Sequence, residues 1–435
     1  MNSAEPKTHG AVEDLESIVA DAEGPTWFSN LRDQAKEKFF SSDWPRTSEE
    51  EWRRTNLSTF EFEVYQSMPP GSFAQTTVTE SVGRDADRSG LLRYWNGSLT
   101  VAELSRDAHD AGVVVGDVAS LAADHPVQKI AEERLTELLA SADNRLQYWN
   151  FALAQGASVV YVPRNVVVDH PIEIDVAVDG DEVVSAPLVV ILLESGAEAT
   201  VVRRVASASD EGEVLVLDGE SVQTGDNARL KYVLLQRLND ESLYFMNSEG
   251  ELTRDAVLHR TEAALGSDFV KTRFVCSLTG AGSDAIVNGI YFAEDEQHMD
   301  VRTVQKHRAP NALSRAYYRG AVRDESHAIY QGLIDVAAKA PGTDAYLTNK
   351  NLILTEEARA DSIPSLNIKT DDVRCSHGST TGKLDAAQIY YLQTRGYSHR
   401  EAQRILVEGY FEDLIAQIPE DLREEFRDLI SERIP

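Results

Sequence analysis

The sequence predicts a mainly β core flanked by α-helical regions at both ends of the chain. Amphipathic helix patterns fill much of the first 150 residues, β-branched segments dominate from about residue 156, and helix patterns return after residue 383. The 435 residues allow a large core and more than one folding unit. We therefore expect a helical region with a loosely structured insert over 1–150, a β core over 151–382 and a helical region over 383–435.

The N-terminal region carries apolar residues at helical spacing over 12–19, 27–35 and 130–139. Pro25 stands at the entry of the second of these helices, a position that proline favours. Thr47 and Glu50 have the spacing of a capping box, which predicts a helix start. The stretch of about 65–100 is rich in Gly, Ser and Thr, and we expect it to be loosely structured.

Strand-like segments follow one another between about residues 156 and 375, with almost nothing helical between them. Turn glycines at 196, 225, 250 and 280 are separated by 29, 25 and 30 residues. Short strands with polar turns fit either a β-sandwich or a stacked β-solenoid. The loose period and the irregular turns favour a parallel β-helix with one coil per 25–30 residues.

Helix signals return in the C-terminal region. Asp385 is placed to cap a helix that Gly396 ends. Ser398 and Glu401 form a capping box for a second helix, which Pro419 ends, and residues 421–434 predict a third helix.

Charge and composition exclude several classes of protein. The 72 acidic residues against 42 basic ones give a net charge of -30, which repels nucleic acid and favours a salt-adapted, halophilic host. No apolar run approaches the roughly 20 residues of a membrane span, and the N-terminus lacks the pattern of a secretory signal. Two cysteines are too few for a disulfide framework. We expect a cytoplasmic protein that binds neither nucleic acid nor membrane.

Cys375 and His377 are the residues most suggestive of chemistry. In an extended chain, residues i and i+2 project from the same face, so a strand here places the thiol beside the imidazole. These groups suit iron, zinc or persulfide chemistry. Two ligands do not make a metal site, so a second chain or other loops must supply the rest. A buried thiol beside a capping histidine is the structural alternative.

The segment that holds this pair also resembles a phosphate-binding loop but fails its requirements. Gly378 and Gly382 are separated by three residues rather than four, and Lys383 is followed by Leu384, which cannot bind a metal ion. We expect that this chain binds no nucleotide.

Other candidate groups carry weaker signals. His298, His307 and His327 lack the spacing of a helical zinc motif and are expected to be structural. Cys276 lies in an apolar strand and is expected in the core. No nucleophile elbow of the G-x-S-x-G type is present.

The segment IPSLNIKTDDVRCSHGSTTGKLDAAQIYYLQTRG resembles the signature of the SufB/SufD family of iron–sulfur cluster assembly proteins. The matching features are Pro364, the run 371–373, the run 375–378 and the pair 395–396. The resemblance covers roughly 145–415 and implies a right-handed parallel β-helix. SufB-like chains carry Glu-His-Glu where this chain has Ser-His-Gly, and a cysteine in the preceding coil that is absent here, so the chain is most similar to the SufD type.

The resemblance implies a non-catalytic scaffold subunit of a SufBCD complex in the SUF system. It implies pairing with a SufB-like subunit through the β-helix edge, binding of a SufC-like ABC ATPase through the C-terminal helices, and a homodimer when the chain is isolated. His377, with Cys375 beside it, maps onto the residue expected to contribute to a transient iron–sulfur cluster shared with the partner. Four aromatic residues exceed what a helical cap needs internally and are expected to anchor the ATPase: Tyr390, Tyr391, Tyr410 and Phe411.

Two other readings of the sequence stay open. A β-helix carbohydrate-active enzyme needs clustered Asp, Arg or Lys on one face of the middle coils, and no such cluster is evident. A stand-alone metal-binding protein is separated from a scaffold by the metal content of the isolated chain.

Overall fold

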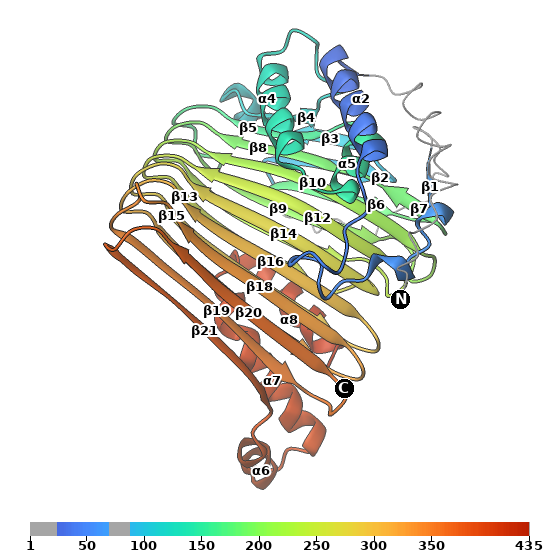
Figure 1. Ribbon diagram of the computed structural model, residues 1–435, viewed down its shortest axis with the longest axis vertical. Coiled ribbons are helices and arrows are strands. Elements are labelled where there is room, and N and C mark those ends of the chain that lie inside the picture. Colours follow the sequence, from blue (N-terminus) through green and yellow to red (C-terminus); the bar gives the residue numbers. More distant parts are fainter. Residues whose placement is uncertain (1–23, 69–87, 435) are drawn as a thin grey trace.

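The computed structural model describes residues 24–68 and 88–434 and consists of two long β-sheets with helices on their outer faces (Figure 1). From β8 onward successive strands alternate between the sheets, and neighbours within each sheet are parallel from β5 onward. This is a parallel β-helix, as the sequence predicts. The expected helix over 12–19 lies outside the described residues. No helix among the described ones is long and apolar enough to span a bilayer.

The strands of one sheet, here sheet A, are β4 (Val114–Asp117), β5 (Ser158–Val162), β8 (Leu188–Leu193), β10 (Val214–Thr224), β12 (Leu243–Leu252), β14 (Phe269–Leu278), β16 (His298–His307), β18 (His327–Val336) and β20 (Arg359–Ile368), with β1 (Gln66–Ser67) and β7 (Val183–Ser185) at its side. Those of sheet B are β3 (Ser98–Leu104), β2 (Gly90–Trp95), β6 (Ile172–Val178), β9 (Glu198–Ser207), β11 (Arg229–Arg237), β13 (Val257–Ala264), β15 (Asp284–Ala293), β17 (Leu313–Val322), β19 (Thr343–Ile353) and β21 (Val373–Lys383).

The register between coils explains the loose period of the sequence. Leu215 pairs with Leu243, Leu243 with Phe269 and His327 with Arg359. One coil therefore spans 28, 26 or 32 residues at these positions. Inward side chains stack on the same position of the next coil, and most are aliphatic or aromatic and buried. Because turns absorb the differences in length, the stacked strands stay in register without a strict repeat.

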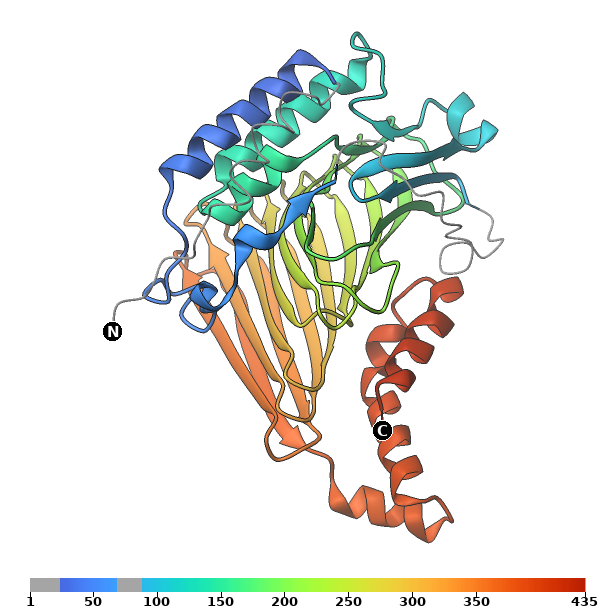
Figure 2. The ribbon, with the colours of Figure 1, turned by 90° about the vertical axis from the view of Figure 1, so that its right-hand side faces the viewer.

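The N-terminal helices cover the outer face of sheet A (Figure 2). They are α2 (Thr26–Ser41), α4 (Pro126–Ser141) and α5 (Arg145–Leu153), with the 3-10 turns η1 (Leu57–Thr59) and η2 (Phe62–Val64) beside them. The short helix α3 (Arg106–Asp110) instead packs Ala108 against the interior of the β-helix. Trp44, Phe62 and Trp149 form an aromatic cluster between helices and sheet. Aromatic side chains bury large apolar areas, so this cluster is a main attachment of the N-terminal region.

Part of the N-terminal region belongs to the β-helix itself. Strand β2 pairs in parallel with β6, and β3 pairs antiparallel with β2. These strands lie partly in the stretch expected to be loose, whose residues 69–87 are outside the described part. The sequence signal for these two strands was weak, because they are short and lie beside a stretch that is rich in Gly, Ser and Thr.

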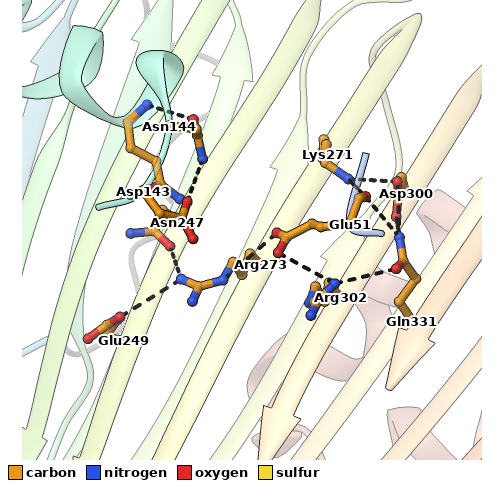
Figure 3. Close-up of polar contacts among 11 residues, drawn as sticks. Glu51, Asp143, Asn144, Asn247, Glu249, Lys271, Arg273, Asp300, Arg302 and Gln331 are labelled. Carbon is orange, nitrogen blue, oxygen red and sulfur yellow. Dashed lines mark hydrogen bonds and ion pairs between the residues drawn. The ribbon is translucent and has the colours of Figure 1, made fainter. Parts of the chain in front are cut away.

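Residues 47–54 form turns rather than the helix that the capping-box spacing predicts. The backbone N–H of Arg46 donates to Glu49 Oε1 at 3.0 Å. The Glu51 carbonyl accepts hydrogen bonds from Lys271 Nζ at 3.0 Å and Gln331 Nε2 at 3.2 Å on sheet A (Figure 3). These long-range bonds hold the segment against the strands of sheet A, so tertiary contacts override the local helix signal.

The C-terminal helices α6 (Ala386–Thr394), α7 (His399–Ile415) and α8 (Arg423–Glu432), with η3 (Glu420–Leu422), follow β21. Asp385 caps α6, and Ser398 with Glu401 completes the predicted capping box of α7. The apolar faces of α7 and α8 pack on the outer face of sheet B, whereas α6 projects beyond the body of the molecule (Figures 1 and 2). Helices therefore cover both outer faces of the β-helix, and α6 takes no part in this covering.

A buried ionic network crosses the interior of the β-helix. Arg203 Nη2 donates to Asp218 Oδ1 at 2.7 Å, and Arg260 Nη1 donates to Glu220 Oε1 at 2.6 Å. Arg203 also lies 3.4 Å from Glu220, and the side chains of Arg203, Asp218 and Glu220 are wholly buried. Buried charges are tolerated only when they are paired and hydrogen-bonded, so the members of the network depend on each other.

Replacing Arg203 by leucine is expected to lower the free energy of unfolding by about 3–5 kcal/mol, because it leaves a buried carboxylate without its partner. The matched control is Arg229→Leu, whose pair with Glu198 is 3.7 Å long and exposed, and which is expected to cost about 0–1 kcal/mol. Urea unfolding followed by circular dichroism measures both. Equal losses in the two variants would contradict the interpretation of the network.

Candidate functional site

The β-helix ends at β20 and β21, and this end is open. Each of these strands is the last of its sheet, and among the described residues no further strand pairs with its outer edge. Leu366 and Ile368 on β20 are 39% and 37% exposed although their register partners Ile334 and Val336 are buried. The inner face of the last coil thus carries exposed apolar side chains and has two unpaired edges, which are a template for another β-structure.

Cys375 and His377 lie on this inner face. Cys375 is in register with the buried Ala345, and His377 is in register with the buried Leu347. The strand therefore places thiol and imidazole on one side, facing the open end of the core. The i, i+2 argument from the sequence holds for their geometry, while their role stays a prediction.

The two groups differ in environment. Cys375 is partly buried against the core, and burial, with Asp344 adding to the effect, raises the pKa of its thiol. His377 is exposed, and its imidazole makes no hydrogen bond within the described part of the chain. A protonated thiol is a weak nucleophile and a weak ligand, so at neutral pH the imidazole is the better metal ligand of the pair.

The pair is incomplete as a metal site. Within residues 24–68 and 88–434 no three His, Cys, Asp or Glu side chains are grouped so that they could hold a metal ion. Iron and zinc sites need about four ligands, so further ligands have to come from outside this part of the chain.

The segment that resembles a phosphate loop is part of strand β21. Residues 378–383 are extended and pair with Thr348–Ile353. Successive N–H groups of an extended strand point to opposite sides and cannot together wrap a phosphate. Lys383 lies 3.8 Å from Glu356, and Asp385 caps α6, so both have structural partners.

The other histidines are not part of the open end. His298 and His327 are neighbours on the outer face of sheet A, with ring centroids 5.2 Å apart, and His327 Nε2 lies 3.1 Å from Asp361 Oδ2. His307 faces the interior, where its Nε2 is 2.8 Å from Ser314 Oγ. Cys276 is 1% exposed and burial raises the pKa of its thiol to about 12, which fits the expected core role.

His307 gives stability a pH dependence. Burial, with Arg308 and Arg315 adding to the effect, lowers the pKa of its imidazole from 6.5 to about 4. The neutral form is favoured in the folded state, so its stabilising contribution is present above pH 6.5 and is lost as the pH falls toward 4. Between pH 8 and pH 5 wild type should lose about 1–2 kcal/mol more than His307→Asn. Urea unfolding at both pH values tests this, and equal losses would contradict it.

The four aromatic residues expected at an ATPase interface separate into two pairs. Tyr390 and Tyr391 on α6 are 69% and 56% exposed. Phe411 is wholly buried on sheet B, and Tyr410 is half-buried with its hydroxyl donating to the Lys350 carbonyl at 2.6 Å. Helix α7 turns Phe411 and part of Tyr410 toward the sheet, so Tyr390 and Tyr391 are the members of the set that lie fully on the surface. The role of these residues at an ATPase interface stays a prediction.

The exposed surface of the C-terminal region includes apolar side chains that the sequence analysis missed. Tyr397 and Ile405 are 45% and 38% exposed. Together with Tyr390 and Tyr391 they form what we call the α6–α7 surface. The signal in the sequence was an apolar residue on the side of α7 opposite its buried face.

Fold and open end define a class of protein: a parallel β-helix that is capped by helices and incomplete at one end. The chain belongs to the SufBD family of the SUF system of iron–sulfur cluster assembly. The family model for the SufBD core domain matches residues 176–410, and that for the SufBD N-terminal region matches residues 15–174.

Individual relatives agree with this assignment. The chain is 33% identical over 276 residues to an iron–sulfur cluster assembly SufBD family protein of Mycobacterium tuberculosis, covering 62% of this chain and 68% of the relative. It is 24% identical over 408 residues to the iron–sulfur cluster assembly protein SufD of Bacillus subtilis, covering 93% of each chain. It is 31% identical over 244 residues to SufD of Escherichia coli, covering 56% and 57%.

Proposed function

We propose that this chain is the SufD-like scaffold subunit of an iron–sulfur cluster assembly complex and is not itself an enzyme. The observation that carries the proposal is the coincidence of two features at one end of the β-helix. The Cys375–His377 pair faces the open core there, and both sheets end there with unpaired edges.

The open end is the proposed contact with a SufB-like subunit. Backbone N–H and C=O groups on the outer edges of β20 and β21 would be satisfied by strands of the partner, and the exposed side chains of Leu366 and Ile368 would be covered. A homodimer of the isolated chain is the same contact made with a second copy. The SufBD core-domain model matches residues 176–410, which include this end of the β-helix. This match supports a similar β-helix as the partner.

Pairing would also complete the metal site. His377 and Cys375 would supply imidazole and sulfur to a transient cluster at the interface, and the partner would supply the remaining ligands. The cluster is the product under assembly rather than a resident cofactor.

The α6–α7 surface is the proposed contact with a SufC-like ABC ATPase, which alone would bind and hydrolyse ATP. This surface projects from the body, so an ATPase can reach it without displacing the open end (Figure 1). Movement of the ATPase would act on the interface through α7, which is packed on sheet B.

Co-expression with a SufB-like chain and a SufC-like ATPase tests the proposal. We expect one complex that contains all three chains and that turns over ATP only when the ATPase is present. Isolation of this chain with neither partner, or tight binding of Mg-ATP by this chain alone in calorimetry, would contradict it.

A further inference from the structure

A groove lies on the outer face of sheet B, far along the β-helix from the open end. Strands β2, β6, β9 and β11 form its floor, α8 forms one wall, and the β2–β3 hairpin with the turns after β9 and β11 forms the other side. Its volume is about 930 Å³, which is the size of a small-molecule site. The groove shares no lining residue with the Cys375–His377 pair or with the α6–α7 surface.

Small residues on the floor create the hollow. Ala177 pairs with Trp95 on one side and with Ala206 on the other, and Ala206 pairs with Arg237. The two alanines leave room between the half-buried indole of Trp95 and helix α8. An indole face at the side of a hollow is a favourable place for a cationic group.

A buried carboxylate lies in the next row of the floor. Asp175 is 1% exposed, and neither of its carboxylate oxygens accepts a hydrogen bond in the described structure. The nearest cationic atoms are Arg204 Nη1 at 3.7 Å and Arg93 Nη2 at 3.9 Å. Buried carboxylates are normally hydrogen-bonded, so Asp175 lacks the donor that this position calls for.

Two of the four arginines of the groove bind other groups as well. Arg204 Nη2 donates to Glu425 at 3.2 Å, and Arg433 pairs with Glu294 and with the Leu265 carbonyl. Burial raises the pKa of the Asp175 carboxyl to about 6 despite the opposing effect of Arg204 and Arg93. The positive charge around Asp175 is therefore too small to compensate for its desolvation.

Carboxylates are spread along the groove rather than gathered at one point. Asp175 lies at the centre, Asp210 and Asp240 lie in the turns after β9 and β11, and Glu432 lies on α8. Six carboxylates against four arginines line the groove, so the site as a whole favours a cation. A ligand with one positive charge can pair with one of these carboxylates, whereas a linear chain with several amines can pair with several.

We propose that this groove binds a linear polyamine, with an ammonium group donating to Asp175, an alkyl segment over the two alanines and further ammonium groups at the acidic ends. The ammonium supplies the hydrogen bond that the carboxylate lacks. Such a ligand would lie between the N-terminal hairpin and α8, and would hold these two parts of the chain together.

Isothermal titration of the full-length chain with spermidine tests the proposal. We expect one saturable site in wild type and about tenfold weaker binding for Asp175→Asn, which keeps the shape of the side chain but removes its charge. Ala206→Phe fills the hollow without changing charge and is expected to weaken binding by a similar factor.

Diffuse attraction of a polycation to a chain of net charge -30 is the alternative source of binding. Asp43→Asn removes one charge at a side chain that is 81% exposed and far from the groove, and it should leave the affinity unchanged. Equal weakening in all three variants, unchanged affinity in Asp175→Asn and Ala206→Phe, or the absence of a saturable site would overturn the proposal. Matching circular dichroism spectra show that the variants are folded.

Discussion

Replacing Tyr390 and Tyr391 together by serine is expected to weaken binding of the SufC-like ATPase by at least about 100-fold. Both side chains are more than half exposed on α6, which projects from the body. Interface tyrosines that become buried on binding each contribute roughly 2 kcal/mol, so the loss of both accounts for a change of this size. Titration of the ATPase against the wild-type and variant chains measures the change.

Fold and the other interface should be unaffected by this change. Neither tyrosine belongs to the cluster that packs α7 and α8 on sheet B, so the thermal midpoint and the pairing with the SufB-like chain should equal those of wild type. Phe40→Ser is the matched control, because Phe40 is a 43% exposed aromatic on α2 at the opposite sheet. An ATPase affinity that is unchanged in the tyrosine variant would place the contact elsewhere.

Deleting the C-terminal helices, residues 385–435, would be a less informative test of the ATPase contact than point substitutions. Phe411, Leu414, Phe426 and Ile430 are buried on sheet B together with strand residues such as Phe292. Deletion exposes this apolar face, so loss of binding and loss of the fold become hard to separate. Point substitutions on the projecting helix avoid that difficulty.

The sequence predicted the architecture well because the fold depends on local signals. Capping by Asp385 and Ser398 and the run of β-branched segments are properties of neighbouring residues, and the structure contains the corresponding helices and strands. The inward direction of Cys375 and His377 also follows from strand alternation once the register with Ala345 is known. Local alternation alone gives the shared face, but not which side of the sheet that face is.

Features that depend on contacts between distant residues were missed. The turn over 47–54 is fixed by Lys271 and Gln331, more than 200 residues away, so no local pattern reveals it. Tyr410 and Phe411 have the composition of an interface, but their burial depends on how α7 lies on sheet B. The groove around Asp175 is formed by elements from both ends of the chain, and the sequence holds no signal for it.

Replacing His377 by alanine is expected to slow cluster assembly in the reconstituted complex on the order of tenfold or more, while the complex still forms. Loss of a metal ligand costs at least as much as loss of a group that only orients one. The strand itself is held by backbone pairing with β19, and the exposed imidazole makes no hydrogen bond in the described structure, so alanine leaves the edge intact. Absorbance of the assembled cluster over time measures the rate, and gel filtration measures complex formation.

Two further variants distinguish a ligand from a structural residue. His377→Cys restores a metal-binding side chain and should recover part of the rate, whereas a packing role would not be rescued by a smaller side chain. His399→Ala removes an exposed histidine at the start of α7 and should have no effect. If His377→Ala assembles clusters at the wild-type rate in an intact complex, the imidazole is structural.

Cys375→Ser should have a smaller effect than His377→Ala at neutral pH, because burial raises the pKa of the Cys375 thiol and keeps it protonated in the isolated chain. The thiolate is the form that binds iron or sulfur, so its contribution should grow as the pH rises toward the thiol pKa. The ratio of wild-type to Cys375→Ser assembly rates should therefore increase with pH. A Cys375→Ser ratio that stays constant across this range would show that the thiol is not a ligand and that the histidine acts without it.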